Sequence, residues 1–101
     1  MTSKHAVIGM MRTAALECAP LKIRVNTVNP APIETRMMRS IEEQMAPGYP
    51  GQAKEQFKSG LPLGRYGQPE EVADLMFFLA SDRSRYCTGG VYMVDGGVSA
   101  T

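Results

Sequence analysis

The sequence has little of the chemistry that marks metal proteins and disulfide-rich proteins. Its 101 residues include no tryptophan, one histidine (His5) and two cysteines (Cys18 and Cys87). The cysteines are far apart and form no CxxC pair, which argues against a zinc site and against a disulfide framework. A single histidine is more often solvated or packed than a ligand or a base. We therefore expect reduced, buried thiols and no metal site.

An excess of charge of either sign is also missing. Eleven basic and ten acidic side chains leave a net charge of +1. No block of like charge indicates a nucleic-acid stripe or a membrane-surface patch. No apolar run approaches the ~20 residues of a membrane span, and no cleavage-site pattern follows Met1. These absences predict a cytoplasmic protein that binds a small molecule, with no nucleic acid and no membrane as partner.

What is present is an ordinary globular composition, with 44% hydrophobic and 21% charged residues. The length allows at most one domain. A chain of this size buries only about 65% of its unfolded surface, so its stability alone would be marginal.

Helical spacing of apolar residues predicts a helix over 6–18, which Pro20 ends. Gly9 lies inside this helix at a cost of about 1 kcal/mol relative to alanine, which suggests that a neighbouring backbone passes close by. The apolar stripe consists of Val7, Met10, Met11, Ala14 and Cys18.

A strand is predicted next, over 23–29, because apolar and β-branched residues alternate with polar ones up to Pro30-Ala31-Pro32. Thr35 can cap a helix over 36–45. Residues 47–51 indicate a turn or an irregular loop.

Three more elements complete the pattern. A second short helix is expected over 52–59, ended by Gly60. Pro69-Glu70-Glu71 begins a helix that ends near Ser81, and 91–94 is a short strand. A strand, a helix and a strand in this order predict a right-handed crossover with parallel pairing, hence an α/β sheet. Two strands are too few for such a sheet, so further strands must come from an upstream segment or another chain.

Ligands of open α/β sheets bind beyond the carboxyl ends of the strands, which here means Asn29 to Thr35. Pro30 and Pro32 remove two backbone donors, leaving the amides of Ile33 and Thr35 and the Thr35 hydroxyl to contact a ligand. A rigid strand-to-helix turn capped by Thr35 is an equally good interpretation of these residues.

The chain contains five strings of interest, in this order: Ser3-Lys4-His5-Ala6-Val7-Ile8-Gly9, Ile23-Arg24-Val25-Asn26, Pro30 with Ile33 and Thr35, Leu63-Gly64-Arg65 with Gly67-Gln68-Pro69-Glu70-Glu71-Val72-Ala73, and Thr88-Gly89-Gly90 with Val94-Asp95-Gly96-Gly97. Taken in order and at their spacing, these strings resemble the short-chain dehydrogenase/reductase family. The resemblance implies that residues 1–101 are the C-terminal portion of a single Rossmann-like domain, a doubly wound parallel sheet, with a substrate loop at about 32–62.

The resemblance also implies site residues. Lys4 matches the catalytic lysine of the family, whose partner tyrosine would lie immediately before Met1. Residues four apart share a helix face, so the ammonium would lower the pKa of that phenol from about 10. Lys4, Pro30, Ile33 and Thr35 would bind NAD or NADP: Lys4 the nicotinamide ribose, and Ile33 (through its backbone) with Thr35 the carboxamide. Without the resemblance, Lys4 would be interpreted as a solvated surface cation.

The sequence departs from the family pattern at Ala31 and in the segment Pro32-Ile33-Glu34-Thr35 that follows it. Ala31 stands where the family usually has glycine; because Pro32 favours an extended Ala31, no left-handed conformation is needed there. The glycine-rich cofactor turn and the catalytic serine and tyrosine are absent from these 101 residues. We therefore expect the isolated chain to be inactive.

Two functions remain open. The first is a fragment of an NAD(P)-dependent oxidoreductase that transfers hydride between nicotinamide and an alcohol or carbonyl substrate. The second is a non-catalytic interaction module that keeps the family's surfaces for homo-oligomers, dimers or tetramers, through apolar faces near Met11, Leu16, Phe77 and Phe78. The substrate loop carries apolar residues that favour packing over a substrate signature, namely Met37, Met38, Ile41, Met45, Tyr49 and Phe57.

Overall fold

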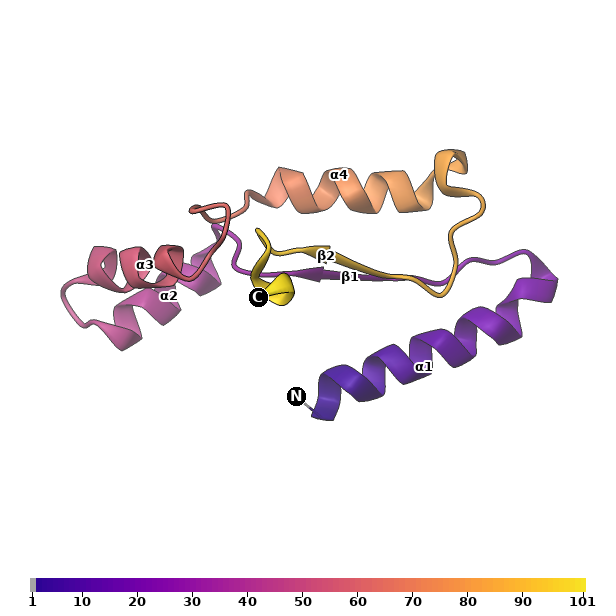
Figure 1. Ribbon diagram of the computed structural model, residues 1–101, viewed down its shortest axis with the longest axis horizontal. Helices are drawn as coiled ribbons and strands as arrows, with labels where there is room; N and C mark the ends of the chain where they lie inside the picture. The colour runs from indigo at the N-terminus through magenta and orange to yellow at the C-terminus, as the bar shows by residue number, and fades with distance from the viewer. Residues whose placement is uncertain (1) are drawn as a thin grey trace. The chain divides into compact units, whose positions relative to one another are not determined.

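The computed structural model describes residues 2–101, so Met1 lies outside the described residues. Along the chain a helix and a strand are followed by three helices and a second strand (Figure 1). The elements are α1 (Thr2–Cys18), β1 (Thr27–Pro30), α2 (Arg36–Met45), α3 (Pro50–Ser59), α4 (Pro69–Ala80) and β2 (Val91–Val94), with short 3-10 turns at Ala19–Leu21, Asp82–Ser84 and Val98–Ala100. None of the helices described is long and apolar enough to cross a membrane.

The chain divides into two compact units. One consists of Met1–Asn29 and Asp74–Tyr92, and the other of Pro30–Ala73 and Met93–Thr101. The first unit contains α1 and the second contains α2 and α3. The candidate ligand-binding segment after β1 belongs to the second unit.

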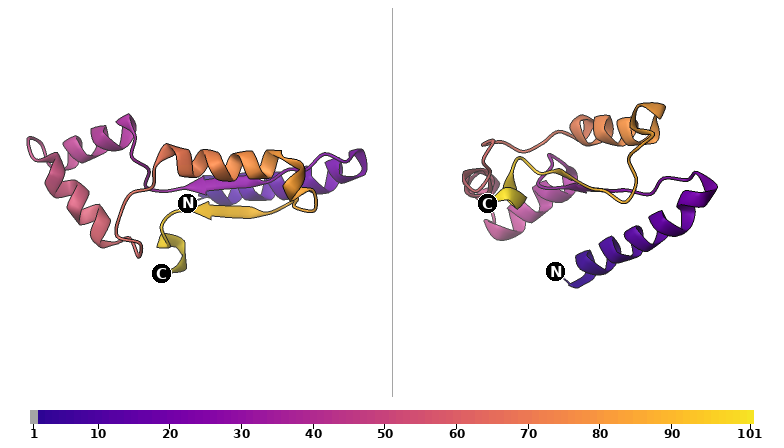
Figure 2. Two further views of the ribbon diagram at one scale, coloured as in Figure 1. Left: turned by 90° about the horizontal axis from the view of Figure 1, so that it is seen from above. Right: turned by 45° about the vertical axis from the view of Figure 1, so that its right-hand side comes forward.

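The two strands pair in parallel, as predicted (Figure 2). The predicted strand over 23–29 begins later, at Thr27. Before that point the chain is held partly by side chains: the Val25 N–H donates to Thr88 Oγ1 at 3.1 Å, and the Gly90 N–H donates to Asn26 Oδ1 at 3.0 Å. Side-chain oxygens thus accept hydrogen bonds that backbone carbonyls would accept in a regular strand pair. This explains why the alternating pattern predicted a longer strand than the structure has.

In the first unit, Arg24 closes the end of α4. Its guanidinium donates to the Leu79 and Ser81 carbonyls at 2.9 and 3.1 Å and to Ser84 Oγ at 2.9 Å. The last carbonyls of a helix lack partners within the helix, so a guanidinium with five donors is well suited to this end. Ser84 is buried, and its hydroxyl contacts the Phe78 carbonyl at 2.8 Å. Arg24 in the family-like string 23–26 therefore has a structural role.

The apolar stripe predicted for α1 is buried only in part. Met11 and the neighbouring Ala15 are buried, whereas Val7 and Met10 are exposed. The expectation of a backbone close to Gly9 is wrong within this chain, because a methyl group there would meet no atom within 4 Å. The periodicity marks an apolar face, but nothing in the described residues covers its outer part.

The two cysteines, Cys18 and Cys87, are free thiols, as predicted. They are half-buried, however, and the prediction of buried thiols is wrong for this chain. Cys87 lies in the turn before β2, and its carbonyl accepts a hydrogen bond from the Asn26 amide at 3.0 Å. Loop and helix-end positions leave part of each thiol uncovered.

In the second unit, α2 and α3 pack against each other as a helical pair (Figures 1 and 2). The predicted bounds of α2 are confirmed, and so is its cap at Thr35. The helix predicted over 52–59 begins two residues earlier, because Pro50 occupies its first turn, where a fixed φ and a missing N–H cost nothing. Gly60 follows its last residue, as predicted.

Candidate functional site

The segment that follows β1 is held in place by Gly67. Ile33 forms an isolated parallel bridge with Gly67. The Gly67 N–H donates to the Pro32 carbonyl at 3.1 Å, and the Glu34 N–H donates to the Gly67 carbonyl at 2.8 Å. In such a bridge the hydrogen bonds use the peptide groups on either side of Ile33, so the N–H and C=O of Ile33 itself point away from Gly67. This edge of Ile33 can therefore bind a ligand.

Gly67 also lies against the Ile33 side chain. A Cβ built on Gly67 would lie 2.8 Å from Ile33 Cδ1, which is closer than carbon atoms can pack. Cδ1 is the end of a flexible side chain, and the nearest backbone atom, the Pro32 oxygen, would be 3.9 Å away, so a larger residue would displace the Ile33 side chain. The backbone hydrogen bonds of Gly67 set the position of the Ile33 segment.

Thr35 combines two chemical roles in one hydroxyl. Its Oγ1 accepts the Met38 N–H at 3.1 Å and caps α2, with Thr35 itself extended at φ −141° and ψ 165°. A hydroxyl that accepts in this way still has its own hydrogen to donate. The capping interpretation is confirmed, and a contact from the same hydroxyl to a ligand stays a prediction.

A cavity of about 440 Å³ lies at this strand end, and we call it the strand-end cavity. Its lining is mostly apolar, with the Thr35 hydroxyl as a polar exception. The lining residues are Pro30, Ala31, Pro32, Ile33, Thr35, Met37, Met38, Ile41, Pro69 and Val72. Three of the predicted site residues, Pro30, Ile33 and Thr35, are brought together here.

The fourth predicted residue, Lys4, lies in the first turn of α1 in the other unit, with an exposed side chain. Ala31 needs no unusual backbone: among residues 2–101, Lys22 is the one non-glycine residue with positive φ. The expectation that Ala31 needs no left-handed conformation is confirmed.

Charged side chains that sequence analysis did not single out lie beside this segment. Glu34 pairs with Lys54 of α3 at 2.6 Å. Tyr66 donates its hydroxyl to Glu42 of α2 at 2.8 Å, and each of these two side chains is 3% exposed. The Lys54 ammonium lies 5.3 Å from the centroid of the Tyr66 ring. We call these four residues the Glu34 network.

The pKa values in the network follow from these contacts. Burial raises the pKa of Tyr66, and the hydrogen bond to Glu42 raises it further. The hydrogen bond from Lys54 to Glu34 raises the pKa of the ammonium. Tyr66 therefore stays neutral and Lys54 stays charged through the physiological range. A protonated phenol can donate to the buried Glu42 carboxyl group over that whole range.

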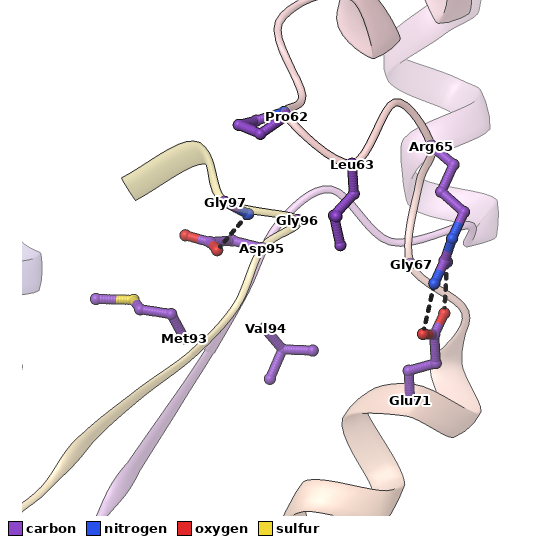
Figure 3. A pocket seen from close by; sticks show the side chains of 10 residues that line it. All are labelled: Pro62, Leu63, Arg65, Gly67, Glu71, Met93, Val94, Asp95, Gly96 and Gly97. Carbon is purple, nitrogen blue, oxygen red and sulfur yellow. Dashed lines mark hydrogen bonds and ion pairs between the residues drawn. The ribbon is translucent and has the colours of Figure 1, made fainter. Parts of the chain in front are cut away.

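A second cavity, of about 430 Å³, lies where the last two family-like strings meet (Figure 3). The Leu63 N–H donates to the Gly96 carbonyl at 3.1 Å. Gly97 has a φ of +97°, and a Cβ there would lie 3.0 Å from Pro62, so a side chain would be strained twice over. Asp95 accepts the Gly97 N–H at 3.1 Å. These strings therefore build a tight contact between two loops.

Arg65 and Glu71 face each other at the edge of this cavity and form two hydrogen bonds, at 2.8 and 2.9 Å (Figure 3). Glu71 also accepts the Gln68 N–H at 2.9 Å, which caps the start of α4. The Arg65 hydrogen bond, helped by that backbone N–H, lowers the pKa of Glu71 to about 2.

This lowered pKa predicts resistance of the loop to acid. Since the folded pKa lies below the usual 4.5, the contribution of the pair to stability is complete above that pH and is lost as the pH falls through about 2. NMR titration of the Glu71 carboxyl carbon should give a midpoint near 2, and Arg65→Gln should move it toward 4.5. A midpoint near 4.5 in the unmodified protein would contradict the paired geometry.

The known proteins that this chain matches are described as reductases and dehydrogenases. A family model described as enoyl-(acyl carrier protein) reductase matches residues 1–99. The 3-oxoacyl-[acyl-carrier-protein] reductase FabG of Thermotoga maritima is 49% identical over 96 residues, which are 95% of this chain and 36% of that protein. The short-chain dehydrogenase fogB of Aspergillus ruber is 46% identical over 100 residues, or 98% of this chain and 34% of that protein. The chain thus spans about a third of the length of the curated relatives it matches.

Solved structures match along nearly the whole chain. A short chain dehydrogenase family protein from Francisella tularensis superposes with a TM-score of 0.93 at 38% identity, over 99% of this chain and 43% of that one. Levodione reductase superposes with a TM-score of 0.92 at 37% identity, over 99% and 39%. The predicted α/β class, with elements that form part of a Rossmann-like parallel sheet, is confirmed.

Proposed function

This chain belongs to the short-chain dehydrogenase/reductase family, and on that premise we propose that it provides the nicotinamide end of an NAD(P)-dependent oxidoreductase. The reaction is hydride transfer between the nicotinamide and an alcohol or carbonyl substrate, and it belongs to the whole protein that carries residues 1–101. Within that protein, these residues form part of one Rossmann-like domain, with a substrate loop at about 32–62.

The observation that carries the proposal is the unused edge of Ile33 beside the Thr35 hydroxyl. A nicotinamide carboxamide has one carbonyl oxygen that accepts and one NH₂ group that donates. The Ile33 N–H and C=O, which point away from Gly67, match this pair, and the Thr35 hydroxyl has its hydrogen to donate. The apolar walls, including Pro30, suit the faces of a flat ring. Bound there, the nicotinamide supplies the carbon that gives or takes the hydride.

The role proposed for Lys4 rests on its place in the family-like string 3–9. Its ammonium binds the nicotinamide ribose and lowers the pKa of a phenol placed four residues before it on the same helix face. Such a phenol exchanges a proton with the substrate oxygen at working pH. Which of NAD and NADP is used depends on residues that bind the adenosine half, and these 101 residues include no glycine-rich turn for it.

We further propose that the whole protein is a cytoplasmic homo-oligomer, a dimer or a tetramer. Support comes from large apolar side chains that this chain leaves exposed on two helices, among them Leu16 of α1 and Phe77 of α4. The same side chains favour the second function, a non-catalytic interaction module. Sequencing the coding DNA before Met1 separates the two: an in-frame tyrosine codon directly upstream, with a glycine-rich turn further away, supports the enzyme, and unrelated sequence supports the module.

Three substitutions of Thr35 test the carboxamide contact. Thr35→Ser keeps the cap and the donor, Thr35→Asp keeps only the cap, and Thr35→Val keeps neither. In the whole protein we expect Thr35→Asp and Thr35→Val to raise KM for the cofactor by about tenfold, the size of a lost ligand hydrogen bond, and Thr35→Ser to change it little. Unchanged KM in Thr35→Asp would remove Thr35 from the site. The isolated 101 residues should give no turnover with NADH or NADPH.

A further inference from the structure

We propose that Glu34 and Lys54 are positioning residues, which set the direction of the Ile33 and Thr35 peptide groups from helix α3. The inference rests on the proposed function, because it concerns the segment that would hold the nicotinamide. Neither residue belongs to a family-like string, and neither lines the strand-end cavity.

Glu34 lies between Ile33 and Thr35, the two residues proposed to bind the nicotinamide carboxamide. The Ile33 C=O and the Glu34 N–H share one planar peptide group, so the bond from that N–H to Gly67, at 2.8 Å, directs the Ile33 carbonyl the opposite way. The next peptide group carries the Thr35 N–H. The two groups can turn relative to each other only about the Glu34 Cα, so an anchored Glu34 side chain restricts the angle between them.

Lys54 anchors the Glu34 side chain. Its ammonium binds the Glu34 carboxylate at 2.6 Å, and the side chains of Lys54 and Glu34 are only 32% and 26% exposed. A charged hydrogen bond of this length and burial is stronger than an exposed ion pair. Burial of both partners also restricts the rotamers through which the segment could relax.

Lys54 is in turn held by the rest of the Glu34 network. Its ammonium faces the Tyr66 ring, a cation–π contact, and the Tyr66 hydroxyl is bound to Glu42. The network therefore joins α2, α3, the loop before α4 and the segment after β1. Loss of Lys54 would therefore leave Glu34 without its ion-pair partner.

A simpler alternative is that the Lys54 pair only helps to keep α3 folded. Helix α3 contains a matched control for this alternative, the pair Lys58 and Glu55 at 3.4 Å. Lys58 is as exposed as Lys54, at 32%, but its partner lies three residues away on the same helix. Lys58→Met removes a lysine and an ion pair from α3 without touching the segment after β1.

The first experiment measures steady-state kinetics and melting temperature of the whole protein carrying Lys54→Met, Lys54→Arg, Glu34→Gln, Lys54→Met with Glu34→Gln, or Lys58→Met. We expect Lys54→Met to raise KM for the cofactor about fivefold, with Lys54→Arg close to the unmodified protein and Lys58→Met without effect. The double variant should be no worse than Lys54→Met, because both changes remove one interaction. Loss of melting temperature with unchanged KM would overturn the proposal.

The second experiment does not depend on catalysis. Amide hydrogen exchange of Glu34 and Met38 reports the bonds to Gly67 and to Thr35 Oγ1. We expect about fivefold faster exchange at both amides in Lys54→Met and no change in Lys58→Met. If the unmodified protein shows no nicotinamide-dependent turnover, the proposed function fails and the exchange rates alone decide the positioning role. Exchange that Lys54→Met leaves unaltered contradicts the role whatever the activity.

Discussion

Replacing Lys4 by alanine in the whole protein is expected to lower kcat by ~10²- to 10⁴-fold, the range that general acid–base catalysis contributes. The reason is electrostatic: without an ammonium on the same helix face, a neighbouring phenol keeps its ordinary pKa of about 10 and exchanges protons poorly at neutral pH. Steady-state turnover with NADH and NADPH across a pH series measures the effect. The pH optimum of residual activity should move upward.

The matched control for Lys4 is Arg12→Ala, which removes another exposed cation from α1. It should leave kcat within about twofold, because a solvated cation away from the chemistry contributes little. If Lys4→Ala retained full turnover, Lys4 would be an ordinary surface cation and the assignment of the catalytic lysine would be wrong. Equal losses in the two variants would point to a general effect of charge on α1.

Replacing Tyr66 by phenylalanine is expected to lower the free energy of unfolding by about 2–3 kcal/mol. The substitution leaves ring packing in place but removes the donor from Glu42, a carboxyl group that is 3% exposed. A buried carboxyl group that has lost its hydrogen-bond donor is neither hydrated nor hydrogen-bonded, which destabilises the folded state. Urea denaturation of the whole protein measures the change, with Tyr86→Phe as a control because Tyr86 is fully exposed.

A second variant separates loss of the hydrogen bond from a change in ring packing. Adding Glu42→Met to Tyr66→Phe removes the buried carboxyl group as well, and should recover much of the lost stability. If Tyr66→Phe changes the free energy of unfolding by no more than Tyr86→Phe, the hydrogen bond does not stabilise the α2 contact. A double variant that is less stable still would show that Glu42 has other favourable contacts.

Local signals in the sequence predicted most helix ends, although the helix predicted over 6–18 begins at Thr2. The bounds of α2 and β2 were predicted correctly, because Thr35 caps the one and glycines flank the other. Proline and glycine act on their own backbone dihedral angles, so their effect can be read from neighbouring residues. The start of α3 was placed two residues late because Pro47-Gly48-Tyr49-Pro50-Gly51 carries turn signals throughout, and Pro50 at a helix start is compatible with either interpretation.

The ion pair and the buried hydrogen bond beside the site could not be predicted in this way. Glu34 and Lys54 lie 20 residues apart, and Glu42 and Tyr66 lie 24 apart. Their pairing depends on how α2 and α3 pack, and each charged residue alone is interpreted as solvated. Buried Glu42 is the clearest example, since an acid in the sequence gives no sign that a tyrosine will reach it.

The family-like strings predicted the site residues before any physical reason for the strings was visible. Gly67 and Gly97 were recognised as parts of strings; in the structure Gly67 forms the bridge to Ile33, and Gly97 combines a positive φ with contact to Pro62. The apolar face of α1 shows the reverse case. Periodicity located this face, but it cannot tell what covers a face, and Met10 is exposed within this chain.

The most direct test of the nicotinamide site is a titration of the isotopically labelled whole protein, followed through its amide resonances. Nicotinamide mononucleotide and adenosine monophosphate are the two probes, because each carries one half of the cofactor. We predict saturable shifts of the Ile33 and Thr35 amides with nicotinamide mononucleotide and none at these amides with adenosine monophosphate. Shifts that leave Ile33 and Thr35 unmoved while other amides respond to nicotinamide mononucleotide would contradict the assignment of this segment as the nicotinamide site.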